Sequence, residues 1–263
     1  MLQLNGRDVT AAEISGLALY NYGHFTSMRV ENSRVPGLSL HLERLRADCA
    51  AVFGADLDLD AVRNQLREAA SEAQGPVIVR VTVYDPNLDL AHPGADSHPH
   101  ILISSRPAAA AAPPLRLKTV RYTRDLPEVK HVGLFATMHA RRAAQRAGWD
   151  DVVFLDPDGR VTEGATWNIG FLDQNDRVVW PDAEVLPGVT MRLLDGLLQQ
   201  AGTPSRSAPL TADLFGQMTG AFAANVSVGV RPISSIDDHR FDDAHPVLTA
   251  LRKSYFAVPG EPI

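Results

Sequence analysis

Cysteine, lysine and long apolar runs are scarce in this sequence, and each shortage excludes something. A single cysteine, Cys49, excludes an internal disulfide. No apolar run reaches the roughly 18 residues of a membrane-spanning helix, and the N-terminal MLQLNGRDVT lacks the basic start and apolar stretch of a secretory signal. We therefore expect a cytoplasmic protein. Only three basic residues are lysines, so chemistry that needs an amine must use Lys118, Lys130 or Lys253.

The residues that are present indicate a folded chain with two domains. The chain is 45% hydrophobic and 21% charged, which is typical of globular proteins. Its 263 residues are more than a domain with one ordinary core needs. A net charge of −6 argues against nucleic acid or an anionic membrane as the main partner.

Apolar periodicity predicts an α+β fold in two lobes. Strands are expected at 2–4, 25–30, 35–40, 76–84, 100–104, 115–122, 152–155, 169–172, 178–180 and 222–230. Helices are expected at 41–53, 58–72, 133–147 and 190–200. The alanine-rich stretch 107–114 is flanked by prolines and predicts a linker between a small domain at 1–106 and a larger domain at 115–263. An ordinary surface loop is the alternative for this stretch.

The segment Leu186-Pro-Gly-Val-Thr190 predicts an anion site, because a Pro-Gly turn leads directly into a helix. The first N–H groups of a helix have no intrahelical acceptor and carry partial positive charge, which favours phosphate. The threonine hydroxyl supplies another donor. Judged alone, Thr190 is more often a plain helix cap.

Two further residues suit a cofactor that is an aldehyde with a pyridine ring. Glu163, in Thr-Glu-Gly between two strands, could keep a ring nitrogen protonated, so that the ring withdraws electrons from a carbanion. Lys130 could hold the aldehyde and then move a proton. A surface carboxylate and a solvated lysine are the alternatives when each residue is considered alone.

Together these segments resemble the fold type IV pyridoxal-phosphate enzymes, which include D-amino-acid and branched-chain aminotransferases and aminodeoxychorismate lyase. The resemblance covers nearly the whole chain and is most specific at 152–171. It implies Lys130 as the Schiff-base and catalytic lysine, in the larger domain, and Glu163 as the partner of the pyridine nitrogen. It implies that pyridoxal 5′-phosphate is held through its phosphate by Arg44, Val189 and Thr190. It also implies a homodimer.

The sequence departs from this pattern in two places. Where the aminotransferases carry consecutive hydroxyl residues it has Asn225-Val-Ser227, either of which could reach the cofactor from one strand face. Where many carry an Arg-Gly pair near the substrate carboxylate it has Tyr84-Asp-Pro. We therefore expect Arg29 to bind the carboxylate, with Thr26 and Tyr84 as further substrate-binding candidates; a salt-bridged strand residue is the alternative for Arg29.

The expected reaction is transamination between an amino acid and an α-keto acid, with D-amino acids slightly favoured. The alternative is aminodeoxychorismate lyase, which gives 4-aminobenzoate and pyruvate, and which Thr26 and Asn225 favour. A ligand-binding relative without catalysis is a third possibility, against which the set of Lys130, Glu163 and Arg44 argues. Three histidines at 92, 98 and 100 lack accompanying ligands at convincing spacing, so no metal site is predicted.

Overall fold

The computed structural model describes residues 2–71, 75–108 and 112–263, in two compact units. Unit 1 comprises Met1–Ala109, Val129–Gly133 and Pro259–Ile263, and unit 2 comprises Ala110–Glu128 and Leu134–Val258. Each unit has helices, a sheet and a core of its own, so the α+β prediction is confirmed. None of the described helices is long and apolar enough to cross a membrane.

Unit 1 is built on an antiparallel sheet of five strands in the order β2-β1-β6-β5-β3. The strands are β1 (Leu2–Leu4), β2 (Arg7–Asp8), β3 (His24–Val30), β5 (Val77–Tyr84) and β6 (His100–Pro107). A separate two-stranded pairing joins β4 (Arg34–Val35) to β16 (Glu261–Pro262), which ties the C-terminal residues to this unit.

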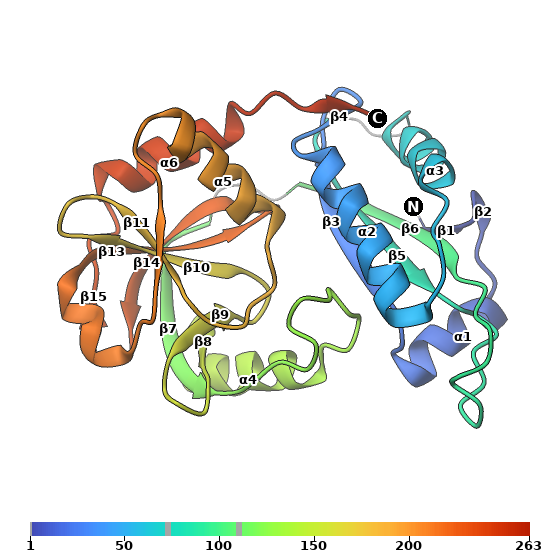
Figure 1. Ribbon diagram of the computed structural model, residues 1–263, viewed down its shortest axis with the longest axis horizontal. Helices are drawn as coiled ribbons and strands as arrows, with labels where there is room; N and C mark the ends of the chain where they lie inside the picture. Colours follow the sequence, from blue (N-terminus) through green and yellow to red (C-terminus); the bar gives the residue numbers. More distant parts are fainter. Residues whose placement is uncertain (1, 72–74, 109–111) are drawn as a thin grey trace. The chain divides into compact units, whose positions relative to one another are not determined.

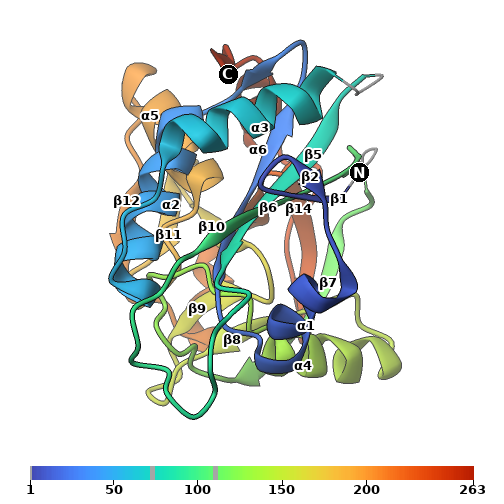
Figure 2. The ribbon, with the colours of Figure 1, turned by 90° about the vertical axis from the view of Figure 1, so that its right-hand side faces the viewer.

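Helices cover both faces of this sheet. Successive side chains of a strand point to opposite faces, so Val83 and Tyr84 of β5 enter different cores. On one face, α2 (Leu38–Phe53) and α3 (Leu59–Ser71) bury the larger core, and both views show them along the same side of β3, β5 and β6 (Figures 1 and 2). On the other face, α1 (Ala11–Tyr20) packs Ile14 and Leu17 against Tyr84.

Unit 2 is built on a larger sheet whose middle strands close on themselves (Figure 1). From β10 the pairing runs through β13, β14, β7, β8 and β9, and β9 pairs again with β10. Such closure removes exposed sheet edges. The closed set is β7 (Leu115–Arg121), β8 (Asp151–Leu155), β9 (Val161–Gly164), β10 (Asn168–Asp173), β13 (Met218–Asn225) and β14 (Gly229–Ile236), with β11 (Val178–Pro181), β12 (Arg206–Ala208) and β15 (His239–Arg240) attached outside it.

The helices of unit 2 pack outside the closed strands. Phe171, Val153 and Ile233 belong to a core shared by these strands, and a second core joins α5 (Val189–Gln200) and α6 (Pro246–Phe256) to β13 and β14. The helix α4 (Phe135–Arg146) packs against β8 through Ala144, and a 3₁₀ helix spans Ala212–Gln217.

Most predicted elements are found, but several differ from the sequence analysis. The run 35–40 is strand only to Val35, and α2 already begins at Leu38. The run 222–230 is a hairpin of β13 and β14 rather than one strand. The helices α1 and α6 were not predicted. Residues 109–111 of the proposed linker lie outside the described residues, while Pro107 ends β6 and Leu115 begins β7.

Candidate active site

Lys130 belongs to unit 1 and not to the larger unit in which it was expected. The N–H of Phe25 donates to the Lys130 carbonyl at 2.9 Å, and the N–H of Val132 donates to the Gly23 carbonyl at 2.9 Å, so this segment extends the edge of β3. The Lys130 N–H donates to Asp48 Oδ2 at 3.1 Å. These three hydrogen bonds fix the backbone around Lys130, although it lies 23 positions after Pro107, the end of the preceding strand of this sheet.

The approach of this segment requires a glycine at position 23. Gly23 has φ +153°, and a Cβ there would lie 2.6 Å from the Val83 carbonyl oxygen, closer than real Cβ atoms come. Only a residue without a side chain lets the chain turn into β3 this close to β5.

A buried histidine places Arg44 near Lys130. His41 and Arg44 are three residues apart on α2, and therefore lie on the same side of the helix. His41 is almost fully buried, its Nδ1 lies 2.7 Å from Thr26 Oγ1, and burial, with the charges of Arg44 and Lys130, lowers its pKa to about 3. The imidazole is therefore neutral, and because the charges of Arg44 and Lys130 both act on it, the two cations share one region of unit 1.

Two of the three predicted substrate-binding residues, Thr26 and Tyr84, have buried side chains that bond to other parts of unit 1. Thr26 is fully buried and bonded to His41 of α2, so it positions His41 instead of lining an open pocket. Tyr84 is fully buried in the α1 core, where its hydroxyl donates to the Glu13 carbonyl at 3.1 Å. Arg29 forms an ion pair with Glu31 at 3.2 Å, as the structural alternative anticipated, and its role towards substrate stays a prediction.

Arg80 is a candidate that the sequence analysis missed. Its Cζ lies 3.6 Å from the ring centroid of Phe25, and Lys130 Nζ lies 4.9 Å from the same centroid. Its Nε donates to Thr82 Oγ1 at 3.1 Å, and burial lowers its pKa. The sequence did carry a signal for Arg80: it is an arginine within the largely apolar strand 77–84, and a buried arginine needs a partner or a ligand.

In unit 2, Glu163 is a buried carboxylate held between two parts of the chain. It lies on β9, and only 7% of the residue is exposed. Arg124 Nη1 lies 3.4 Å from its Oε1, and the Leu186 N–H donates to its Oε2 at 3.4 Å. Glu163 is therefore tied to the turn that precedes α5, and not to a solvated hairpin.

That turn leads into α5 as the sequence predicted. Gly188 is the N-cap residue with extended backbone, and the helix begins at Val189, which is buried together with Thr190. A Cβ on Gly188 would lie 1.9 Å from Asn168 Oδ1, so only glycine permits the turn to pack this closely. Thr190 is not the cap: its Oγ1 lies 3.4 Å from the Tyr255 hydroxyl.

Asn225 ends β13 and Ser227 lies in the turn before β14, so the prediction that they alternate on one strand face is wrong. The Asn225 Oδ1 accepts hydrogen bonds from the N–H groups of Ser227 at 3.0 Å and Val228 at 3.1 Å. A side-chain oxygen that closes a turn in this way is a common feature of asparagine. The role of both residues towards a cofactor stays a prediction.

These groups fit the chemistry of pyridoxal phosphate. Lys130 offers an amine for an aldehyde, and the buried Glu163 offers an anion for a ring nitrogen. The start of α5 and Arg44 offer N–H donors and a cation of the kind that binds phosphate. The described residues contain no group of three or more metal-ligating side chains, and His92 instead contacts Asp89.

His24, whose backbone pairs with that of His131, makes unit 1 sensitive to acid. Both ring nitrogens are buried without a hydrogen-bond partner among the described residues, and burial lowers the pKa from 6.5 to about 4. The unfolded chain therefore binds the proton first as pH falls. The stability present above pH 6.5 is lost between pH 6.5 and about 4.

We expect His24→Leu to reduce this loss, because leucine needs neither a proton nor a partner. Between pH 7 and pH 5 the free energy of unfolding should fall by about 2 kcal/mol less in the variant than in the wild type. Urea unfolding at the two pH values measures this difference. The exposed His98→Leu is the control and should keep the wild-type dependence. An unchanged dependence in His24→Leu would contradict the assignment.

Comparison with known proteins gives consistent results. Residues 23–236 match the model of the family described as amino-transferase class IV. A probable branched-chain-amino-acid aminotransferase of Rickettsia felis is 24% identical, over 92% of this chain and 88% of the relative. The structure of the branched-chain aminotransferase of Thermoproteus uzoniensis with norvaline has a TM-score of 0.84 at 20% identity, covering 97% and 93% of the two chains. A hypothetical aminotransferase from Mycobacterium tuberculosis in its PLP-bound form has a TM-score of 0.82 at 18% identity, covering 98% of each chain. The fold type IV prediction is confirmed.

Proposed function

Because the chain belongs to the class IV aminotransferases, we propose that it is a pyridoxal-phosphate-dependent transaminase whose amino donors are branched-chain amino acids. The observation that carries the proposal is the family match over residues 23–236, which spans Lys130, Glu163 and the start of α5. Each of these lies in a local setting that suits its proposed role.

When bound, pyridoxal phosphate would supply an aldehyde carbonyl and an electron-withdrawing ring. Lys130 holds the cofactor and then moves the α-proton with its free amine, since its backbone anchors keep it in place. Glu163 holds a proton at the pyridine nitrogen. Arg44 and the N–H groups of Val189 and Thr190 bind the phosphate.

Arg80 is the residue that we propose for the substrate carboxylate. Its guanidinium and the Lys130 amine contact one phenylalanine ring, which places a planar cation close to the reacting amine. A guanidinium forms two parallel hydrogen bonds to a carboxylate. This assignment takes over the role that the sequence analysis gave to Arg29.

The names of the relatives favour branched-chain donors over the D-amino acids that the sequence analysis favoured. The relative from Rickettsia felis and the structural neighbour from Thermoproteus uzoniensis are both named for branched-chain substrates. These relatives are aminotransferases, so we do not propose the lyase. The homodimer and the cytoplasmic location stay predictions.

Absorbance spectroscopy of the holoenzyme tests the proposal. We expect L-leucine, L-isoleucine or L-valine to remove the absorbance band of the enzyme-bound cofactor, and 2-oxoglutarate to restore it. Loss of the band with D-alanine or D-glutamate alone would contradict the donor class and return the assignment to D-amino acids. A band that resists every amino acid would contradict transamination, and release of pyruvate from aminodeoxychorismate would then establish the lyase.

A further inference from the structure

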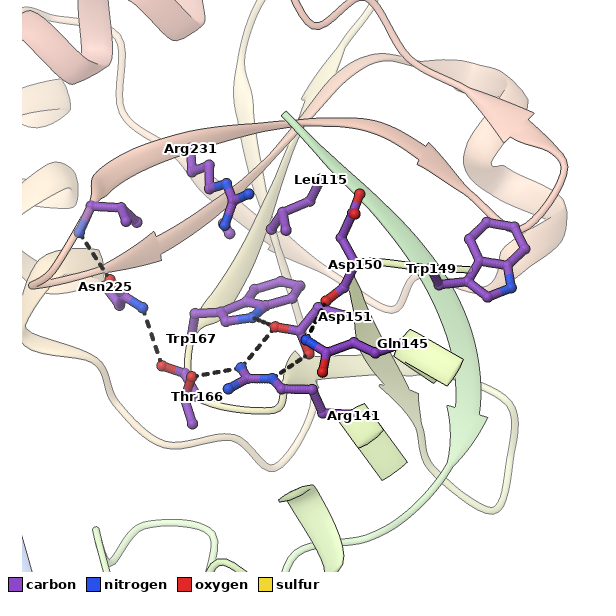
Figure 3. Close-up of a pocket in the computed structure, with 12 residues that line it drawn as sticks. Leu115, Arg141, Gln145, Trp149, Asp150, Asp151, Thr166, Trp167, Asn225 and Arg231 are labelled. Atoms are coloured by element: carbon purple, nitrogen blue, oxygen red, sulfur yellow. Dashed lines mark hydrogen bonds and ion pairs between the residues drawn. The ribbon is translucent and has the colours of Figure 1, made fainter. Parts of the chain in front are cut away.

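Unit 2 contains a cavity of about 440 Å³ whose lining includes none of the residues that the proposed function assigns to cofactor or substrate. It lies among α4, β7, the chain before β10, and the β13–β14 hairpin (Figure 3). Its volume is within the range of small-molecule sites, roughly 300–1,000 Å³. Of the residues predicted for the cofactor, Asn225 lines this cavity, whereas Lys130, Arg44, Glu163 and Thr190 do not.

Most of the charge around this cavity is already neutralised. Asp151 accepts two hydrogen bonds from Arg141, at 2.9 and 2.7 Å, and one from Trp167 Nε1 at 2.9 Å (Figure 3). The carboxylate of Asp150 is bound by the N–H of Arg116 at 2.7 Å and by its Nε at 3.3 Å. The two carboxylates therefore leave little attraction for a cationic ligand.

Arg231 is a charged lining residue that is not neutralised in this way. Its Nε donates to the Pro113 carbonyl at 2.7 Å, and within the described ranges its two terminal nitrogens have no hydrogen-bond or ion-pair partner. Partial burial lowers its pKa, and the neighbouring Arg141 acts in the same direction, against the charges of Asp150 and Asp151. Figure 3 shows the guanidinium above Trp167 and beside Leu115. An anion arriving there would gain two charge-assisted hydrogen bonds.

The remaining lining is mixed: Gln145, Thr166 and Asn225 are polar, and Trp149, Trp167, Leu115, Ala223 and Val228 are apolar. Of the two tryptophans, Trp167 lies below the Arg231 guanidinium in Figure 3, whereas the indole ring of Trp149 points away from it. Aromatic rings favour an aromatic ligand through stacked or edge contacts. We infer that this cavity binds a small arylcarboxylate, with the carboxylate on Arg231 and the ring against Trp167.

Calorimetric titration of the wild-type holoenzyme tests this inference without reference to turnover. We expect phenylacetate or benzoate to bind, while the uncharged phenylacetamide and benzamide bind at least about tenfold more weakly, because a hydrogen bond to a charged group is lost. Acetate and inorganic phosphate should also bind weakly, because they lack the ring. Equal binding of acetate would contradict the aromatic part of the inference, and no binding of either arylcarboxylate would overturn it.

Variants locate the site. Arg231→Gln should weaken phenylacetate binding by about tenfold or more. Arg160→Gln, which removes the same charge from an exposed residue of unit 2, should leave it unchanged. Arg231→Lys keeps the charge without the planar fork, and should bind with intermediate affinity. Thermal melts show that each variant is folded, and wild-type affinity in folded Arg231→Lys and Arg231→Gln would overturn the inference.

Discussion

Lys130→Ala should lower the turnover rate by about 10⁴-fold or more, because one substitution removes both the amine that holds the cofactor and the base that moves the α-proton. The variant should still fold, since the segment is fixed by backbone hydrogen bonds to Phe25, Gly23 and Asp48 that alanine retains. Steady-state transamination and a thermal melt measure the two effects.

Because the chain has only three lysines, the one that carries the cofactor can be identified directly. Borohydride reduction of the holoenzyme, followed by peptide mass spectrometry, should place the cofactor on Lys130 and leave Lys118 and Lys253 unmodified. Lys118→Ala removes a surface ion pair to Asp237, in which the two charged atoms lie 2.8 Å apart, and should retain activity. Cofactor on Lys118 or Lys253, or full activity in Lys130→Ala, would refute the assignment.

Glu163→Gln should lower kcat by about 10²–10³-fold, the loss typical of removing one preorganised electrostatic stabiliser. Glutamine has nearly the same shape and can still accept from the Leu186 N–H, so the turn before α5 should persist. What it loses is the negative charge that holds a proton at the ring nitrogen. The expected result is therefore a fall in kcat with little change in the amount of bound cofactor.

The control is Glu184→Gln, which makes the same change at an exposed position two residues before Leu186. It should leave kcat within about twofold, as is usual for surface substitutions away from a site. The ratio of cofactor to protein in each variant comes from absorbance. If Glu163→Gln kept the wild-type kcat with full cofactor, Glu163 would be only a structural partner of Arg124 and Leu186.

Local patterns predicted the elements whose signals lie within a few residues. The strand at 25–30, the helix at 190–200 and its start after a Pro-Gly turn were all found, because strand alternation and helix starts are local features. The missed α1 had such a signal as well, a capping box of Thr10 and Glu13, but its short apolar pattern was obscured by alanine. The hairpin at 225–229 was missed because its turn interrupts a run that is otherwise apolar.

The sequence by itself determined the chemical groups of this protein and their local settings: a scarce amine at Lys130, an acid at Glu163 between two strands, and a helix that begins after Gly188. Only the tertiary structure decided which distant groups meet. It placed Lys130 on the edge of β3, Arg80 over Phe25, and Arg231 in a cavity lined by α4. The physical reason is that local propensity acts over a few residues, whereas these contacts depend on strand order and register, which packing of the whole unit selects.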